Sequence, residues 1–363
     1  MRVATLTFHW ATNYGAVLQA YALQQFLARH GYDTEILDYS PRRARRLRTL
    51  QNLRSRDVRA FVREARLRGF RRRRLRLSAR RYSSETDLLE AGGLYDAFVC
   101  GSDQIWNEWF SLHGEGGPTR SYFLGFVPSG GRRVAYAASF GTDAPTAGLT
   151  EVARPELAQF SAIGVREDSG ARAVADMGLP GAVVVADPTL LLSRGDYDRL
   201  IAEVSPRRRY PLFAYLLHAS QGSATAVVEA ASRVLPAQRH VFRGGPIALP
   251  EWLFHLRHAE LVITNSFHGA MMSLIFQRPF LVVPVEGAGS TMNGRILTLM
   301  RSVGLEERIV GADESARVED LIKAQIDWDA VGAALDALRR RSEAFLLDAL
   351  AETASDEPDP IAE

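Results

Sequence analysis

Short apolar runs alternate with helix-like segments through the first half of the chain. An apolar run at 3–7 is followed by residues 15–30, which repeat apolar side chains on one helical face, and then by a run at 34–37. Further runs that predict strands lie at 97–100, 134–138, 163–166 and 183–186. Because helices separate the strands, we expect a parallel sheet in a first Rossmann-like domain over residues 1–190.

The same alternation begins again after residue 205. The second set of apolar runs lies at 212–217, 241–242, 261–264 and 280–283. It predicts a second Rossmann-like domain over 205–325. A tail, 326–363, follows it with a helix from about residue 329 and an acidic end at 352–363. The fold class is therefore expected to be α/β, with two Rossmann-like domains.

A strongly basic segment interrupts the first domain at about 41–81. Between Arg42 and Arg81 the chain has 18 arginines but only two acidic residues, Asp57 and Glu64. Leucines at roughly helical spacing predict one or two basic amphipathic helices inserted into the domain. The segment is interpreted either as a solvated helical hairpin or as a surface for anionic lipid or a phosphorylated acceptor. Nucleic acid is not expected, since no nucleic-acid motif and no interleaved aromatic residues are present.

Composition excludes several classes of protein. The chain has 363 residues, 47% of them hydrophobic, and a formal net charge of +2. The single cysteine, Cys100, rules out an internal disulfide framework and a cysteine metal cluster. No apolar run reaches the roughly 18 residues of a membrane span, and the N-terminus does not resemble a signal peptide. We expect a cytoplasmic protein, with peripheral contact to the inner face of the membrane as an alternative. Walker, GxGxxG, HExxH and GxSxG motifs are absent, which argues against the chemistries they carry.

The most informative stretch is 261–279, an apolar strand, a polar turn and an apolar helix with His268 at the turn. The free N–H groups and positive dipole end of that helix suit an anionic substrate group. Histidine can move a proton near neutral pH. The alternative is a structural histidine at an ordinary turn.

Polar residues also follow several other predicted strands, at the edge where open α/β sheets bind ligands. They are His9, Asn13, Tyr14 and Gly15; Ser102, Asp103, Gln104 and Asn107; Arg166 and Glu167; Asn265 and Ser266; and Asn293 and Arg295 after a Gly-rich loop. Together they predict one crevice with carboxylate, imidazole and guanidinium groups, as a transferase of an anionic donor requires. The alternatives are that Asp103 only caps its turn, that Arg166 only pairs with a carboxylate, and that Tyr14 only packs beneath the loop.

Six segments carry a resemblance to a known family. They are TFHWATNYGAVLQAYALQ, FVCGSDQIWN, YAASFG, VRED, VVADPTLLL and VITNSFHGAMMSLIFQRPF, in this order, within about Arg2 to Leu305. The chain resembles the polysaccharide pyruvyl transferase family. The resemblance implies two Rossmann-like domains facing across a cleft, the GT-B architecture. It also implies transfer of pyruvate from phosphoenolpyruvate to a cell-surface or lipid-linked glycan as a cyclic ketal. Phosphate is released, and no organic cofactor or essential metal is implied.

The motif positions imply a role for each candidate residue. His268 would perform acid–base catalysis, and Asp103 would orient or deprotonate the acceptor. The donor would be held by Arg166, Arg295, Ser266, Asn265 and Gly269, and the acceptor by Asn13, Tyr14 and Gln104. Two other functions remain open: a GT-B glycosyltransferase that uses a nucleotide sugar, and a non-catalytic relative that binds glycan or membrane.

Overall fold

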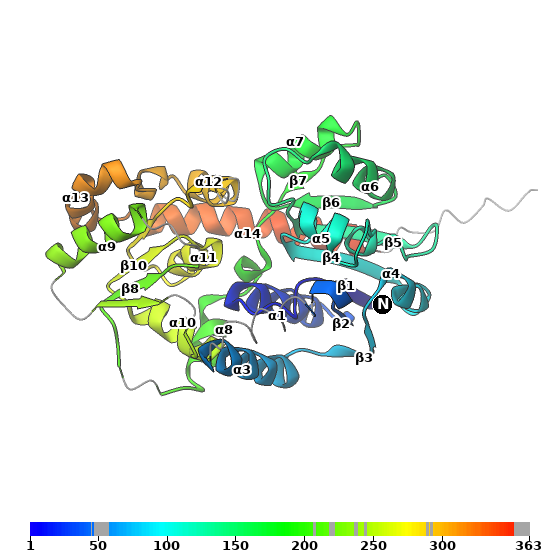
Figure 1. Cartoon of the computed structure of the whole chain (residues 1–363), viewed down its shortest axis with the longest axis horizontal. Helices are drawn as coiled ribbons and strands as arrows, with labels where there is room; N and C mark the ends of the chain where they lie inside the picture. Colours follow the sequence, from blue (N-terminus) through cyan, green and yellow to red (C-terminus); the bar gives the residue numbers. More distant parts are fainter. Residues whose placement is uncertain are drawn as a thin grey trace, which may run out of the picture.

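The computed structural model describes residues 1–44, 46, 58–205, 208–217, 222–235, 239–242, 245–287, 290 and 293–351. Figure 1 shows two α/β domains side by side, with the long helix α14 (Trp328–Leu350) running across both. The predicted α/β class with two Rossmann-like domains is confirmed. The predicted acidic end, residues 352–363, lies outside the described residues.

The first domain is built on a seven-stranded sheet of order β3-β2-β1-β4-β5-β6-β7, in which all neighbouring strands are parallel. Its strands are β1 (Arg2–Leu6), β2 (Asp33–Tyr39), β3 (Leu77–Tyr82), β4 (Ala97–Asp103), β5 (Arg132–Ala138), β6 (Ala162–Val165) and β7 (Val183–Val184). Val3 and its neighbour Ala4 belong to different apolar clusters. The sheet is therefore buried on both faces, as parallel sheets usually are.

The helices of the first domain lie between these strands along the chain. They are α1 (Tyr14–Arg29), α3 (Val58–Arg74), α4 (Glu85–Leu88), α5 (Glu108–His113), α6 (Ala147–Leu157), α7 (Asp168–Asp176) and α8 (Arg194–Ile201). Three short 3₁₀ helices accompany them: η1 (Leu89–Ala91), η2 (Ser121–Phe123) and η3 (Pro188–Leu191).

The second domain has a four-stranded parallel sheet of order β11-β10-β8-β9. Its strands are β8 (Leu212–Tyr215), β9 (Arg239–Phe242), β10 (Leu261–Thr264) and β11 (Phe280–Val282). Its helices are α9 (Ser223–Val234), α10 (Leu249–His258), α11 (Phe267–Ile275), α12 (Asn293–Ser302) and α13 (Val318–Lys323), with the 3₁₀ turns η5 (Glu306–Arg308) and η6 (Ala312–Arg317).

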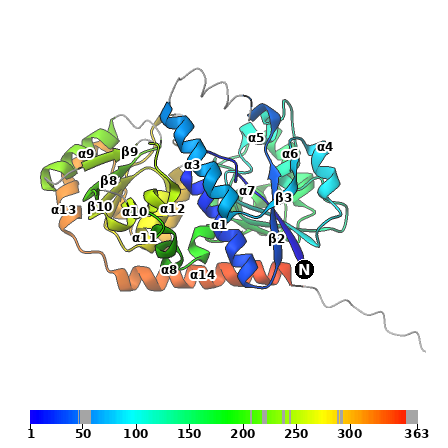
Figure 2. The ribbon, with the colours of Figure 1, turned by 90° about the horizontal axis from the view of Figure 1, so that it is seen from below.

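Helix α14 connects the two domains through packing (Figure 2). Val331 and Leu335 join an apolar cluster that contains Trp252 of the second domain. Leu346 and Leu350, three turns or more further on, join the cluster beneath the first sheet. None of the helices in the described ranges is both long and apolar enough to span a membrane.

The prediction of an all-helical basic insertion at 41–81 is partly wrong. Residues 58–74 do form the helix α3, but Leu77–Tyr82 form β3, the edge strand of the sheet. β3 pairs with β2 at Ile36↔Leu77 and Tyr39↔Tyr82. The strand is tolerated at the edge because its arginines stay in solvent while Tyr82 is buried. The predicted helical residues at 45 and 47–57 lie outside the described residues.

Candidate active site

The ends of β4 and β5 leave regular strand geometry where the site begins. Ser102 and Asp103, the last residues of β4, have φ angles of +26° and +66°, and Ala137 in β5 has +54°. These positive values are costly for residues with a Cβ and tend to occur at functional sites. The Asp103 carboxylate accepts a hydrogen bond from the Gln104 backbone N–H at 2.9 Å, which fixes its direction.

Arg166 and Asp187 form a buried ion pair at the adjacent strand ends. Arg166 Nη1 donates to Asp187 Oδ2 at 3.1 Å, and both side chains are almost completely buried. Asp103 Oδ1 lies 3.6 Å from Arg166 Nη2, and Glu167 Oε2 lies 3.9 Å from Arg166 Nε. One guanidinium thus links three carboxylates that come from three different strand ends.

The other oxygen of Asp187 fixes the chain after β7. Its Oδ1 accepts from the backbone N–H of Thr189 at 3.0 Å and from the Thr189 hydroxyl at 2.7 Å. The Ser102 hydroxyl donates to Oδ2 at 2.7 Å. Although burial alone would raise the pKa of Asp187, the nearby His268 ring, Arg166 and the Ser102 hydroxyl hold that pKa well below its usual range. Asp187 is therefore a fixed negative charge at the domain interface.

His268 brings the second domain to this negative charge. It lies in the first turn of α11, whose N-cap residue Ser266 accepts from the Gly269 N–H at 3.4 Å. His268 Nε2 lies 3.5 Å from Asp187 Oδ2. On its other side the ring contacts Gly15 of α1 so closely that a Cβ on Gly15 would overlap it. The predicted turn histidine is thus held between the two domains.

A cleft of about 130 Å³ opens beside His268. The predicted residues that line it are Asn13, Asp103, Gln104, Asn265, Ser266, His268 and Arg295. Asn13 and Ser266 are the N-caps of α1 and α11, so two helix N-termini face this cleft. Both provide the partial positive charge that favours an anion.

Arg295 provides a full positive charge in the same cleft. With its amide oxygen directed toward Arg295, Gln104 accepts from Nη2 at 2.8 Å and from Nη1 at 3.2 Å. Burial, together with the charge of Arg166, lowers the pKa of Arg295 to about 10. The guanidinium remains charged at neutral pH, and a bound anion would relieve the repulsion between the two arginines.

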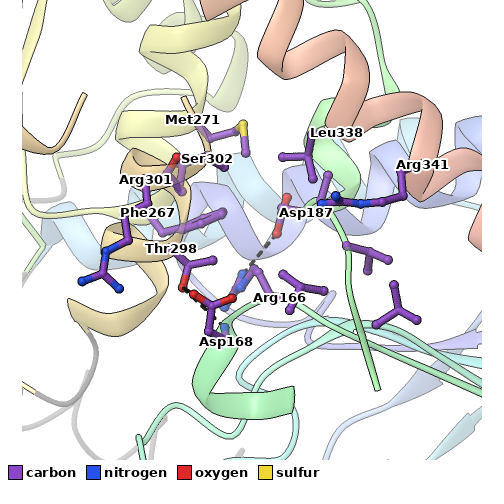
Figure 3. Close-up of a pocket in the computed structure, with 15 residues that line it drawn as sticks. Arg166, Asp168, Asp187, Phe267, Met271, Thr298, Arg301, Ser302, Leu338 and Arg341 are labelled. Atoms are coloured by element: carbon purple, nitrogen blue, oxygen red, sulfur yellow. Dashed lines mark hydrogen bonds and ion pairs between the residues drawn. The ribbon is translucent and has the colours of Figure 1, made fainter. Parts of the chain in front are cut away.

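A larger cavity, of about 480 Å³, is also bordered by Arg166 and Asp187 (Figure 3). In Figure 3 these two side chains point toward each other, while Arg341 of α14 and Arg301 of α12 lie at other edges. Thr298 donates to Asp168 at 3.4 Å across the two domains. Phe267 borders both this cavity and the cleft. The Arg166–Asp187 pair therefore forms part of the wall of this larger cavity.

Two predicted site residues are placed elsewhere. Tyr14 is fully buried, and its hydroxyl donates to the carbonyls of Gly245 and Ile247 at 3.1 and 2.9 Å. It connects the domains and does not line the acceptor side of the cleft. Gly269 is inside α11 with its N–H bonded to the cap, and a Cβ there would overlap Thr264. Its role is close packing of α11 on β10, because no amide is left to hold a donor.

Arg166 is also more enclosed than a direct ligand of the donor would be. It does not line the cleft, and its exposed fraction is 3%. Asp103, Asp187 and Glu167 outweigh the effect of burial and raise its pKa. Arg166 therefore pairs with carboxylates in the structure, as the alternative reading expected. Direct contact between Arg166 and a donor stays a prediction.

The predicted site residues did not include Asp187, and Glu167 and Gly15 were noted after strands without a predicted role. Asp187 directly follows the predicted strand 183–186, so the rule that polar residues at strand ends mark the site could have found it. Glu167 is buried, accepts from the Ser139 hydroxyl at 2.6 Å, and has a pKa raised by that burial. No local pattern indicates that Gly15 packs against the imidazole ring, because that contact depends on a histidine 253 positions later in the chain.

Within the described part of the chain, no three His, Cys, Asp or Glu side chains are grouped so as to hold a metal ion. The polar groups of the cleft are instead arranged around arginine and helix N-termini. The arrangement can bind an anion and place one imidazole and one carboxylate beside it.

Comparison with known proteins assigns the chain to a family. No curated protein matches it. Among solved structures it is similar to a UDP-GlcNAc 2-epimerase from Neisseria meningitidis bound to UDP-GlcNAc, with 9% identity, a TM-score of 0.45, and coverage of 96% of this chain and 100% of that one. It is also similar to Arabidopsis thaliana UGT89C1 complexed with UDP, with 9% identity, a TM-score of 0.44, and coverage of 98% and 96%. A family model described as polysaccharide pyruvyl transferase matches residues 13–287, well over half of the chain. The protein therefore belongs to the polysaccharide pyruvyl transferase family.

Proposed function

We propose that the protein transfers pyruvate from phosphoenolpyruvate to two hydroxyls of a glycan, which forms a cyclic ketal and releases phosphate. The observation that supports this most is the set of groups around one cleft. His268 and Arg295 come from the second domain and Asp103 from the first, and two helix N-termini face the same space. An acid, a base and an anion site are the parts that this transfer needs.

The donor carries a phosphate and a carboxylate on one small carbon skeleton. In the proposal, Arg295 binds one of these anions as a planar fork, and the N-termini of α1 and α11 stabilise the other. Asn265 and Ser266 line the same cleft and would contact the donor. Arg166 acts as a positioning residue, because it holds Asp103 and Asp187 at 3.6 and 3.1 Å.

His268 would supply the proton for the first step. It protonates the methylene carbon of phosphoenolpyruvate, and the adjacent carbon becomes electrophilic. The first sugar hydroxyl attacks that carbon, a C–O bond forms, and Asp103 takes the hydroxyl proton. Asp187, 3.5 Å from His268 Nε2, would orient the ring and stabilise its protonated form.

The second step closes the ketal. The bond between the central carbon and the phosphate oxygen breaks, and phosphate leaves with the bonding electron pair. The second hydroxyl then attacks the same carbon and loses its proton to the departing phosphate. The proton that Asp103 took from the first hydroxyl then returns to His268, which replaces the proton given to the methylene carbon. The other hydroxyl proton leaves with phosphate, so the enzyme returns to its initial state. Asn13 and Gln104 line the side of the cleft that the acceptor would occupy.

Calorimetric titration with phosphoenolpyruvate tests the donor assignment. Arg295→Gln should weaken binding by about tenfold or more, because a charged hydrogen-bonded pair is lost. Arg301→Gln is the matched control, since Arg301 is an exposed arginine on the same helix, α12, outside the cleft. UDP-glucose is titrated in parallel. No binding of phosphoenolpyruvate, or binding of UDP-glucose in its place, would overturn the proposal.

A further inference from the structure

A second polar cavity, of about 480 Å³, lies within the first domain. Its walls come from the loop after β1, the end of β2, the edge strand β3 and the basic helix α3. Four arginines line it: Arg68, Arg71, Arg72 and Arg81. Among the described residues, two carboxylates do so, Asp38 and Glu64. The arginine-rich segment thus forms one wall of a built cavity.

The two carboxylates are already engaged by part of this positive charge. Glu64 Oε1 accepts from Arg71 Nη2 at 2.7 Å, and Asp38 Oδ2 accepts from Arg81 Nε at 3.1 Å. Arg72 is exposed and has no ion pair with any residue in the described part of the chain. The cavity therefore keeps a surplus of positive charge after its internal pairs are formed.

His9 also lines this cavity. Its Nδ1 faces the Thr7 carbonyl oxygen at 3.2 Å, and its Nε2 faces Asp38 Oδ1 at 3.3 Å. His9 is buried, with an exposed fraction of 2%, and is held in this geometry by its two partners.

The cavity also holds a hydroxyl without a partner. Ser40 lines it, is 5% exposed, and its Oγ makes no hydrogen bond with the described residues. A buried hydroxyl without a partner is costly, and a ligand oxygen would satisfy it. Arginine forks and a hydroxyl donor are together groups that bind a phosphate.

We propose that this cavity binds a phosphate group carried by the acceptor, while the acceptor's sugar occupies the cleft beside His268. The loop after β1 supports this link, because His9 and Trp10 line the cavity and Asn13 lines the cleft. Four residues span at most about 14 Å, so one extended ligand can reach both sites. Arg71 Nη1 donates to the Ala11 carbonyl at 3.1 Å and so ties α3 to the middle of this loop.

This inference rests on the proposed function for the acceptor, but the phosphate site can be tested without the reaction. The probe is inorganic pyrophosphate, titrated calorimetrically into the full chain at low salt. The double variant Arg72→Gln/Arg81→Gln should weaken binding at least tenfold. Arg73→Gln/Arg80→Gln is the matched control, because it removes the same charge from α3 and β3 at residues that do not line the cavity. Circular dichroism checks that both variants are folded.

Three outcomes separate the sites. Equal pyrophosphate affinity in the two double variants would overturn the inference, and so would loss of binding in Arg295→Gln alone, which would place pyrophosphate in the donor cleft. Phosphoenolpyruvate should bind Arg72→Gln/Arg81→Gln as tightly as it binds the wild type. The binding of phosphoenolpyruvate therefore tests the donor proposal separately from the phosphate cavity.

The source of the phosphate needs a second pair of probes. Glucose 1-phosphate represents a sugar-borne phosphate, and dodecyl phosphate represents a lipid-borne one. At least one of these two probes should bind more tightly than inorganic phosphate, and Arg72→Gln/Arg81→Gln should weaken that binding. The probe that binds more tightly identifies the source. If neither binds more tightly than inorganic phosphate, the assignment to the acceptor is wrong.

Discussion

Gly15 and His268 come from different domains and lie in direct contact, with the backbone of α1 against the imidazole ring. A side chain at position 15 would occupy the space of the ring. The contact places the candidate acid of the second domain beside Asn13, the N-cap of α1 in the first. The position of His268 thus depends on how the domains are docked.

Gly15→Ala should reduce turnover by about 10²-fold, because displacing a reacting group by about 1 Å costs that much. Helix propensity alone predicts a more stable α1 in this variant, since alanine stabilises helices more than glycine does. A loss of turnover would therefore not come from a weakened helix. Steady-state turnover with phosphoenolpyruvate measures the effect. Gly332→Ala is the control, since Gly332 lies in α14 with no atom within 4 Å of a Cβ placed there. Normal turnover in folded Gly15→Ala would show that this contact does not position His268.

His268→Ala should reduce turnover by about 10²- to 10⁴-fold while the fold is retained, as expected when a general acid is removed. If Gly15→Ala acts through His268, the double variant should be no slower than His268→Ala alone. Additive losses in the double variant would mean that Gly15 acts by another route.

Asp187→Asn should lower the free energy of unfolding by about 3 kcal/mol, since it leaves the buried charge of Arg166 with one partner fewer. Urea denaturation at neutral pH measures this loss. Asp176→Asn, on the exposed end of α7, is the control and should change stability by less than about 0.5 kcal/mol. If Asp187→Asn lowers the free energy of unfolding as little as the control does, Asp103 and Glu167 are enough to balance the buried charge of Arg166.

The contribution of Asp187 to stability should depend on pH. The pKa of Asp187 is lower in the folded protein than the usual value of about 3.9 in an unfolded chain. Its ionised form therefore adds stability that is fully present above about pH 4 and is lost as the pH falls toward the folded pKa. The difference in urea midpoint between the wild type and Asp187→Asn should be constant from about pH 5 to 7 and shrink below about pH 4. A difference that grows on acidification would contradict this.

Tyr14→Phe should cost about 1 kcal/mol of stability, because it removes the hydroxyl that donates to Gly245 and Ile247 across the domains. The KM for the acceptor should not change, since Tyr14 does not line the cleft. Tyr21→Phe, in the same helix and packed on Phe70, is the control for ring packing. A raised KM in Tyr14→Phe would restore the acceptor role predicted from sequence.

Several features of the fold could be predicted from local pattern. The period of apolar residues predicts β10 at 261–264 as the structure has it, and the first helix to within one residue at each end. Polar residues directly after strands predicted most of the cleft, including Asp103 and His268. Both signals are local, because a strand or helix buries its own apolar face and parallel strands end at one edge.

Other predictions from the sequence were wrong because they depend on contacts between residues far apart in the chain. Residues 77–81 were predicted to belong to the helical basic insertion, but an edge position beside β2 makes Leu77–Tyr82 a strand. Tyr14 looks like a cleft residue in its loop, but the second domain supplies its hydrogen-bond acceptors.

By itself, the sequence determined most of the alternation of strands and helices, the two-domain α/β class and the turn that carries His268. Only the tertiary structure decided that Arg166 links three carboxylates, that Asp187 faces His268, and that Gly15 must have no side chain. The physical reason is that local structure follows from short-range periodicity and backbone preference. The charge pairs and close contacts of the site depend instead on which strand ends become neighbours and how two domains dock.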